Sequence, residues 1–213
     1  MATENMNSDQ TSGTSSISDK AAVINSIMQP GKSLRAAGYC LYSSASILVF
    51  SIGNGVHMFT LDPTLNEFVL TNPNVRIPKR GNIYSCNESN SEGWNDSMKA
   101  YIKALRTGNN ESGVKYTSRY VGSLTADIHR TLLYGGIFSY ARDKLYHPDS
   151  NLQLLYKSAP LAFLIKQAGG KNSKGEGKEV LDITPQSIDE RQPCFKAKYQ
   201  KCYLPKLTRI LKC

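Results

Sequence analysis

The stretch RYVGSLTADIHRTLLYGGIFSY, residues 119–140, contains the clearest helix and strand signals of the chain. Ser123 is a residue type that caps the start of a helix, and LTADIHRTLLY continues from it as a helical segment. The pair Gly135-Gly136 ends that segment, because glycine is common just past the end of a helix. The β-rich IFSYAR follows. We therefore predict a helix from Ser123 to the glycine pair and a short strand directly after it.

The same stretch contains residue types that bind an anion. Arg119 and Tyr120 stand just before the predicted helix start, and Tyr140 follows the glycine pair. An arginine fork, tyrosine hydroxyls and a free helix N-terminus are what an anion such as phosphate needs. The alternative is that both tyrosines lie at the edge of the core and that Arg119 is a solvated loop cation. The pattern alone leaves these two interpretations open.

The segments before this stretch predict mainly strands. Two β-rich runs, ASILVFSI and VHMFTLD, flank the turn sequence GNG at 53–55, which is a strong hairpin signal. EFVLT predicts a further strand. The segment 33–42 predicts a short helix capped by Ser33. Residues 92–106 have apolar side chains at helical spacing and predict an amphipathic helix.

The segments after residue 140 predict one more helix and two strands. PLAFLIKQAGG, residues 160–170, has proline at its start and glycine at its end, as a helix requires. LQLLY at 152–156 and VLDI at 180–183 predict short strands. Because strands and helices interleave and a hairpin is present, we predict an α/β fold, a layered mixed β-sheet with packed helices.

Composition predicts one folded domain with a polar leader and a basic tail. The chain has 213 residues, 40% of them apolar and 20% charged, which excludes wholesale disorder. Residues 1–27 predict a disordered polar leader, 28–195 the folded domain and 196–213 a divergent tail. No apolar run approaches the length of about 20 residues that crosses a bilayer, so we predict no membrane span.

Most of the net charge of +9 comes from the tail, which contains six basic residues and no acidic one. Such a tail could contact nucleic acid or an acidic membrane surface. Its aromatic residues are not arranged as a stacking platform, so we favour a solvated tail and expect neither partner. The leader contains acidic residues and no arginine, whereas a transit peptide is basic. This favours the cytoplasm, with the chloroplast as the alternative.

Residue patterns alone identify no catalytic residue and no metal ligand. The five cysteines are scattered without CxxC spacing, which fits neither a disulfide scaffold nor a zinc site. His57 falls within a predicted strand and His129 within a predicted helix, so we interpret both as structural. The clustered carboxylates that a divalent metal requires are also missing.

Six segments of the chain together resemble the fructose-1,6-bisphosphatase family, and their sequences are most similar to its plant and algal members. They follow one another in family order over residues 28–193: QPGKSLRAAGYCLYSSASILVF, GVHMFTLDPTLNEFVLT, IPKRGNIYSCNE, RYVGSLTADIHRTLLYGGIF, LQLLYKSAPLAFLIKQAGG and VLDITPQSIDERQP. The resemblance implies the C-terminal, sugar-phosphate-binding part of that fold. It also implies a Mg²⁺-dependent hydrolase of gluconeogenesis or the Calvin cycle that removes the 1-phosphate of fructose 1,6-bisphosphate.

The resemblance implies four substrate-binding residues. Asn87 stands in the family's NE element, which helps to hold the 6-phosphate of the sugar. Arg119 matches an arginine that reaches that phosphate across a subunit interface, and Tyr120 and Tyr140 match two tyrosine ligands. The implied partners are fructose 6-phosphate or fructose 1,6-bisphosphate and further subunits in a homo-oligomer. Sedoheptulose 1,7-bisphosphate is a related substrate.

The departures from the family concern its metal site and one phosphate-binding position. Family members carry an acidic DPxDGSSN metal loop in a half that precedes the QPG element, and this chain does not contain that loop. Lys157 stands where a metal-binding glutamate follows LLY, and Asn151 replaces a phosphate-binding lysine. A cation at position 157 would repel Mg²⁺.

Two interpretations of the function follow. In the first, this is a truncated fructose-1,6-bisphosphatase that retains part of the 6-phosphate pocket, lacks most Mg²⁺ ligands and is inactive alone. In the second, it is a non-catalytic protein that binds sugar phosphate or joins full-length family subunits. Whether the chain is an enzyme stays open between them.

Overall fold

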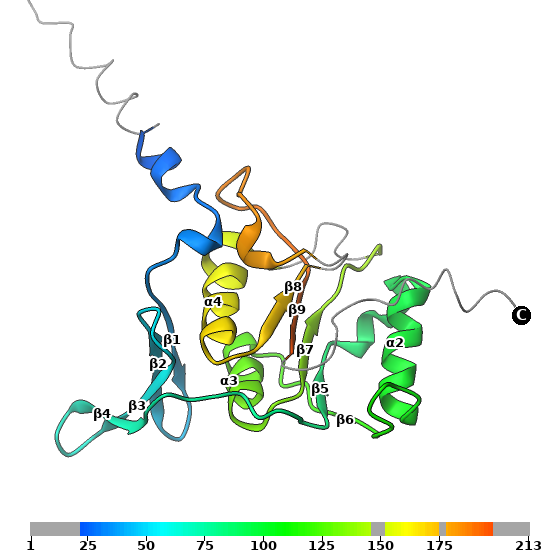
Figure 1. Ribbon diagram of the computed structural model, residues 1–213, viewed down its shortest axis with the longest axis horizontal. Coiled ribbons are helices and arrows are strands. Elements are labelled where there is room, and N and C mark those ends of the chain that lie inside the picture. Colours follow the sequence, from blue (N-terminus) through cyan, green and yellow to red (C-terminus); the bar gives the residue numbers. More distant parts are fainter. Residues whose placement is uncertain (1–21, 146–151, 175–177, 198–213) are drawn as a thin grey trace, which may run out of the picture.

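Two β-sheets, with a layer of helices between them, form most of the described part of the chain. The computed structural model describes residues 22–145, 152–174 and 178–197. Figure 1 shows one sheet, two helices, the second sheet and then a further helix on the outer face of that sheet. This confirms the predicted α/β fold with packed helices, although the strands are divided between two sheets.

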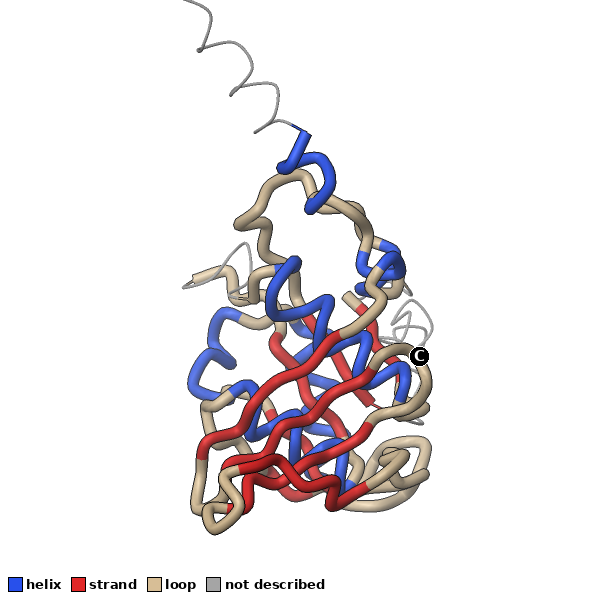
Figure 2. Tube along the Cα trace, turned by 90° about the vertical axis from the view of Figure 1, so that its left-hand side faces the viewer, coloured by secondary structure: helices blue, strands red, loops and turns tan. Residues whose placement is uncertain are grey.

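The first sheet is a four-stranded antiparallel meander that faces the viewer in Figure 2. Its strands, in spatial order, are β1 (Ala37–Tyr42), β2 (Ser46–Ser51), β3 (His57–Asp62) and β4 (Glu67–Asn72). The predicted hairpin at 53–55 is confirmed, because β2 pairs with β3 across it. Gly53 and Gly55 both have positive φ, at 94° and 84°, a conformation that glycine adopts without steric strain.

The helix predicted for 33–42 is wrong. Gly31–Ser33 form only a 3₁₀ turn, and β1 begins four residues later. The strand pairs with β2 from Ala37 opposite Ser51 to Tyr42 opposite Ser46. Ala37 and Tyr39 alternate into the core. Pairing with β2 therefore decides this conformation, and it overrides the local capping signal of Ser33.

The second sheet is mixed and contains four strands that the sequence did not predict. Its spatial order is β6 (Thr117–Ser118), β5 (Ile83–Ser85), β7 (Ile137–Tyr140), β9 (Cys194–Ala197) and β8 (Lys171–Ser173). The β5 strand is parallel to β6 and β7, whereas β9 is antiparallel to β7 and β8. The predicted strand after the glycine pair is therefore confirmed as β7.

The three predicted helices after residue 90 are confirmed. They are α2 (Asp96–Thr107), α3 (Leu124–Tyr134) and α4 (Ala159–Gln167). Asn95 caps α2, because its side-chain oxygen accepts a hydrogen bond from the Met98 N–H at 2.9 Å. Ser123 stands at the N-cap of α3 and Gly135 at its end, as predicted, although the Ser123 side chain makes no capping bond.

Two short strands predicted in the C-terminal part are wrong. Leu154–Ser158 form a turn of π-helix that continues directly into α4, and Gln153 forms only an isolated bridge with Arg191. Val180–Asp182 form a 3₁₀ turn. Both segments are apolar because they face the core, and a short apolar run does not distinguish a strand from a buried turn.

Two hydrophobic clusters hold these layers together. The larger one lies between the two sheets around α3 and α4 and includes Val49, Met58, Ile128, Leu132 and Leu164. The smaller one joins α2 to the outer face of the second sheet and includes Tyr84, Met98, Ile102, Leu105 and Ile137. The second sheet is therefore covered on both faces. The C-terminal end of β7 lies beside the candidate site.

The ends of the described range reach into the predicted leader and tail. Residues 22–27 are helical, within the segment 1–27 predicted as a disordered leader. Residues 196–197, assigned to the tail, belong to β9. The rest of the leader and of the tail lies outside the described residues and stays a prediction. None of the helices in the described ranges is long and apolar enough to cross a membrane.

Both histidines interpreted as structural make structural contacts. His57 Nδ1 accepts a hydrogen bond from the Asn74 N–H at 3.3 Å. His129 Nδ1 lies 3.0 Å from the Tyr39 hydroxyl, and the two rings meet edge to face. Tyr39 and His129 are both about nine-tenths buried, so this pair ties α3 to β1 inside the core.

We expect His129 to make the stability of the fold depend on pH. Burial lowers the pKa of His129, so the folded chain binds this proton less readily than the unfolded chain does. The contribution is therefore fully present above the ordinary histidine pKa of about 6.5, and it is lost as the pH falls from that value through the lowered pKa of the folded chain. Urea unfolding at about pH 8 and about pH 5 measures it. The His129→Gln variant should lose less stability between these two pH values, and His57→Gln, the control, should behave like the natural chain. Equal losses in all three proteins would contradict this prediction.

Candidate functional site

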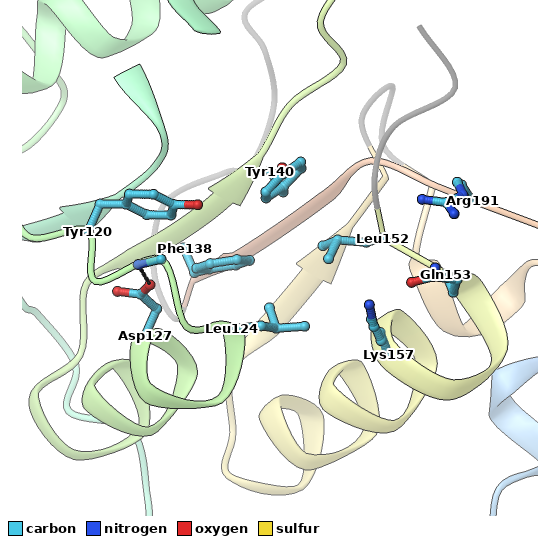
Figure 3. Close-up of a pocket in the computed structure, with 10 residues that line it drawn as sticks. Tyr120, Leu124, Asp127, Phe138, Tyr140, Leu152, Gln153, Lys157 and Arg191 are labelled. Atoms are coloured by element: carbon cyan, nitrogen blue, oxygen red, sulfur yellow. Dashed lines mark hydrogen bonds between the residues drawn. The ribbon is translucent and has the colours of Figure 1, made fainter. Parts of the chain in front are cut away.

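A cavity of about 390 Å³ lies beside the end of β7, between α3 and the segment that leads into α4 (Figure 3). Its wall comes from five parts of the chain: the loop before α3, α3 itself, β7, the segment before α4 and the segment around Arg191. The lining residues are Tyr120, Gly122, Leu124, Asp127, Phe138, Tyr140, Leu152, Gln153, Lys157 and Arg191. The cavity therefore depends on segments that are distant in the sequence.

Two of the four predicted binding residues, Tyr120 and Tyr140, meet in this cavity. Tyr120 lies in the loop between β6 and α3, and Tyr140 is the last residue of β7. Figure 3 shows the Tyr120 hydroxyl directed toward Tyr140. Burial, with a smaller contribution from the nearby Tyr140 and Asp127, raises the pKa of Tyr120. The phenol is therefore neutral at physiological pH and can donate a hydrogen bond to an anion.

The other two predicted residues, Asn87 and Arg119, do not line the cavity. Asn87 caps the 3₁₀ turn Glu88–Gly93, and its side-chain oxygen accepts hydrogen bonds from the N–H and the hydroxyl of Ser89. Arg119 is exposed, and its guanidinium donates to the Ser118 carbonyl at 3.1 Å. Their roles in binding stay predictions.

Asp127 is a cavity residue that sequence reasoning missed. Its fully buried carboxylate accepts hydrogen bonds from the N–H groups of Val121 and Gly122, both at 3.2 Å. It also forms an ion pair with Arg130 at 2.6 Å. These bonds hold the loop that carries Tyr120 against the first turns of α3. The available signal was an acidic residue near a helix start, followed three residues later by arginine.

The opposite end of the cavity is cationic. Lys157 belongs to the π-helical turn before α4, is half-buried and makes no hydrogen bond or ion pair with any described residue. The side-chain oxygen of Gln153 is buried and has no hydrogen-bond partner among those residues. Arg191 lies beside them in Figure 3, because its backbone pairs with that of Gln153. The sequence marked Lys157 only as a departure from the family's metal site.

Comparisons with protein families divide the chain between the two sheets. Residues 77–203 match the family "Fructose-1-6-bisphosphatase, C-terminal domain", and residues 12–73 match "Fructose-1-6-bisphosphatase, N-terminal domain". The chain belongs to the fructose-1,6-bisphosphatase family. The boundary between 73 and 77 separates the two sheets, so β1 to β4 belong to the N-terminal domain of the family and the cavity to the C-terminal domain. The portion predicted as C-terminal from residue 28 thus includes residues of both domains.

Relatives and solved structures agree with this membership. The cytosolic fructose-1,6-bisphosphatase of Brassica napus is 49% identical over 173 residues, which cover 81% of this chain and 50% of the relative. The chloroplastic enzyme of Oryza sativa subsp. indica is 51% identical over 172 residues, which cover 81% of this chain and 42% of the relative. The crystal structure of Leishmania major fructose-1,6-bisphosphatase in holo form matches with a TM-score of 0.79 and 40% identity, over 93% of this chain and 56% of that one. The chain thus spans about half the length of the curated relatives it matches.

The cavity does not fit Mg²⁺, the metal that the resemblance to this family implies. Mg²⁺ binds oxygen ligands, usually including at least one carboxylate. The one carboxylate that lines the cavity, Asp127, is already bound by Arg130 and by two backbone N–H groups. The other charged lining residues, Lys157 and Arg191, are cations. Within the described ranges, no group of three or more His, Cys, Asp or Glu residues is placed to hold a metal. Asn151 lies outside those ranges.

Proposed function

We propose that this chain binds a phosphorylated sugar in the cavity between Tyr120 and Lys157, as the sugar-phosphate-binding part of a fructose-1,6-bisphosphatase. The family reaction is the Mg²⁺-dependent hydrolysis of the 1-phosphate of fructose 1,6-bisphosphate. The observation that carries the proposal is the meeting of Tyr120 and Tyr140 in one cavity. These are the two tyrosines that the family resemblance implies as ligands of the 6-phosphate.

The chemistry of the cavity suits such a ligand. Neutral tyrosine hydroxyls can donate to phosphate oxygens at one end. Leu124, Phe138 and Leu152 form an apolar middle, against which the C–H groups of a sugar can pack. The volume of about 390 Å³ lies within the range of about 300–1,000 Å³ that is usual for small-molecule sites.

We propose that hydrolysis is not carried out by this cavity alone, because its charged side chains do not fit Mg²⁺. The alternative function is a non-catalytic one, in which the chain binds sugar phosphate or assembles with other subunits of the family. One observation supports assembly: Arg119 is exposed and does not line the cavity of its own chain, so its guanidinium is accessible to a neighbouring subunit. For the compartment we propose the cytoplasm, with the chloroplast as the alternative. The relatives that this chain resembles include both cytosolic and chloroplastic proteins.

Two measurements on the purified chain test the proposal. Calorimetry with fructose 6-phosphate measures binding, and phosphate release from fructose 1,6-bisphosphate with Mg²⁺ measures turnover. Binding without turnover supports a sugar-phosphate site that is not catalytic alone. Binding with turnover supports the family reaction in this chain. Absence of binding to either sugar phosphate contradicts the proposed function.

We expect Tyr120→Phe to weaken the binding of fructose 6-phosphate by about 1.5–3 kcal/mol, because one hydrogen bond to a charged phosphate is lost. The aromatic ring remains, so the fold should be unaffected. Tyr134→Phe is the matched control, since Tyr134 is exposed on α3 and does not line the cavity. Calorimetric titration of both variants checks the prediction. An equal affinity in the two variants would remove Tyr120 from the binding site.

A further inference from the structure

Lys157, at the cationic end of the cavity, lacks an anionic partner within the described protein. Lys157 is half-buried, and no described residue forms a hydrogen bond or an ion pair with it. Figure 3 shows its ammonium group directed into the space below Leu152 and Gln153. A partly buried charge is costly unless an opposite charge or hydrogen-bond acceptors lie nearby. The cavity's carboxylate cannot serve, because Asp127 is paired with Arg130 on the tyrosine side.

Gln153 adds a second, independent sign that a ligand completes this end. It is about nine-tenths buried and lines the cavity, and its side-chain amide makes no hydrogen bond to a described residue. A buried amide without partners is unusual and unfavourable in a folded protein. A hydroxyl group can both donate to its oxygen and accept from its nitrogen. The missing partner at this end therefore combines an anionic group with neighbouring hydroxyls.

We propose that Lys157 binds the second phosphate of a sugar bisphosphate directly, so that an ammonium group takes the place of a divalent cation at this end of the cavity. The inference rests on the proposed function, in which the first phosphate and the sugar lie between Tyr120 and Leu152. Arg191 adds a second positive charge beside the same phosphate. Gln153 contacts the sugar hydroxyls near it. Ammonium and guanidinium groups form charge-assisted hydrogen bonds with phosphate oxygens without any metal.

Two consequences distinguish this binding mode from a metal-bridged one. The bisphosphate should bind more tightly than the monophosphate, because only the bisphosphate reaches both ends of the cavity. The gain should be about tenfold to a hundredfold, the usual effect of hydrogen bonds to a charged group. The gain should also be the same with Mg²⁺ and with EDTA, since no metal lies between Lys157 and the phosphate.

The experiment compares fructose 1,6-bisphosphate with fructose 6-phosphate by calorimetry on the full chain, each in EDTA and in Mg²⁺. Lys157→Gln removes the charge and should reduce the affinity for the bisphosphate to that for the monophosphate, while the monophosphate affinity changes little. Lys157→Arg should keep most of the gain. Lys166→Gln is the matched control, because Lys166 stands on the adjoining α4, is exposed and pairs with Glu179 outside the cavity. Circular dichroism and thermal unfolding of each variant confirm that it is folded.

Each outcome decides a separate point. A gain for the bisphosphate that does not depend on Mg²⁺ and disappears in Lys157→Gln supports the inference. Equal affinities for the two ligands in the natural chain overturn it and leave the proposed function intact. A gain that appears only with Mg²⁺, or one that persists in Lys157→Gln, also overturns it. Absence of binding by either ligand overturns both the inference and the proposed function.

Discussion

Replacing Asp127 with alanine is expected to destabilise the folded chain by about 3–5 kcal/mol, the usual cost of removing one partner of a buried ion pair. Asp127 is fully buried, and Arg130, at 2.6 Å, would lose its partner. The guanidinium of Arg130 would keep only its hydrogen bond to the Arg119 carbonyl, at 2.6 Å, since its Nε is buried without a hydrogen bond. The N–H groups of Val121 and Gly122 would also lose their acceptor.

Denaturant unfolding, followed by circular dichroism, measures this loss. Asp96→Ala is the matched control, because Asp96 is an exposed acidic residue in the first turn of α2 and should contribute only about 0.3–1 kcal/mol. An Asp127→Ala, Arg130→Met double variant removes both charges and should recover part of the stability, since no uncompensated charge remains. If Asp127→Ala costs no more than Asp96→Ala, the buried ion pair is not what stabilises this loop.

The same change is expected to weaken ligand binding. Asp127 does not need to touch the ligand for this effect, because it fixes the backbone of the loop that carries Tyr120. Gly122 has a φ of +85°, so this loop holds a conformation that few residue types adopt and that the two bonds to Asp127 help to maintain. The stability of the fold and the geometry of the tyrosine end of the cavity thus depend on one carboxylate.

The elements that the sequence predicted correctly are those with local determinants. The helix α3 is bounded by Ser123 and Gly135, and the hairpin between β2 and β3 by Gly53 and Gly55, all within a few residues of the element they define. The predicted helix at 33–42 failed because its conformation depends on β2, with which it pairs. The β9 strand was missed for the same reason, since it pairs with β7 from a distant part of the sequence.

The candidate site was predictable to a similar extent. The family resemblance assigned a role to Tyr120, which precedes α3, and to Tyr140, which ends β7, and the two meet because β7 packs against α3. Lys157 lies in a π-helical turn, and Gln153 directly before it, in a segment that the sequence suggested was a strand. Their side chains reach the cavity only because α4 packs between the sheets. The charge at that end of the cavity is therefore a property of tertiary packing.

Phe138→Ala is expected to destabilise the chain by about 3–5 kcal/mol, the usual cost of truncating a buried phenylalanine. Phe138 is 1% exposed, belongs to the larger hydrophobic cluster and lines the cavity. Its ring therefore separates the ligand cavity from the core around α3 and α4. Loss of the ring removes packing for both, and the void left behind is continuous with the cavity, so water can enter the space that the ring filled.

The matched control for this change is Phe68→Ala on β4, where the side chain is 42% exposed. Because the Phe68 side chain is only partly buried, its truncation should cost no more than about 1 kcal/mol. Denaturant unfolding measures both variants, and fructose 6-phosphate titration under conditions where Phe138→Ala is still folded measures binding. If the ring shapes the cavity as well as the core, affinity falls in Phe138→Ala and is unchanged in Phe68→Ala. If Phe138→Ala lost stability and kept its affinity, the apolar middle of the cavity would not contact the ligand.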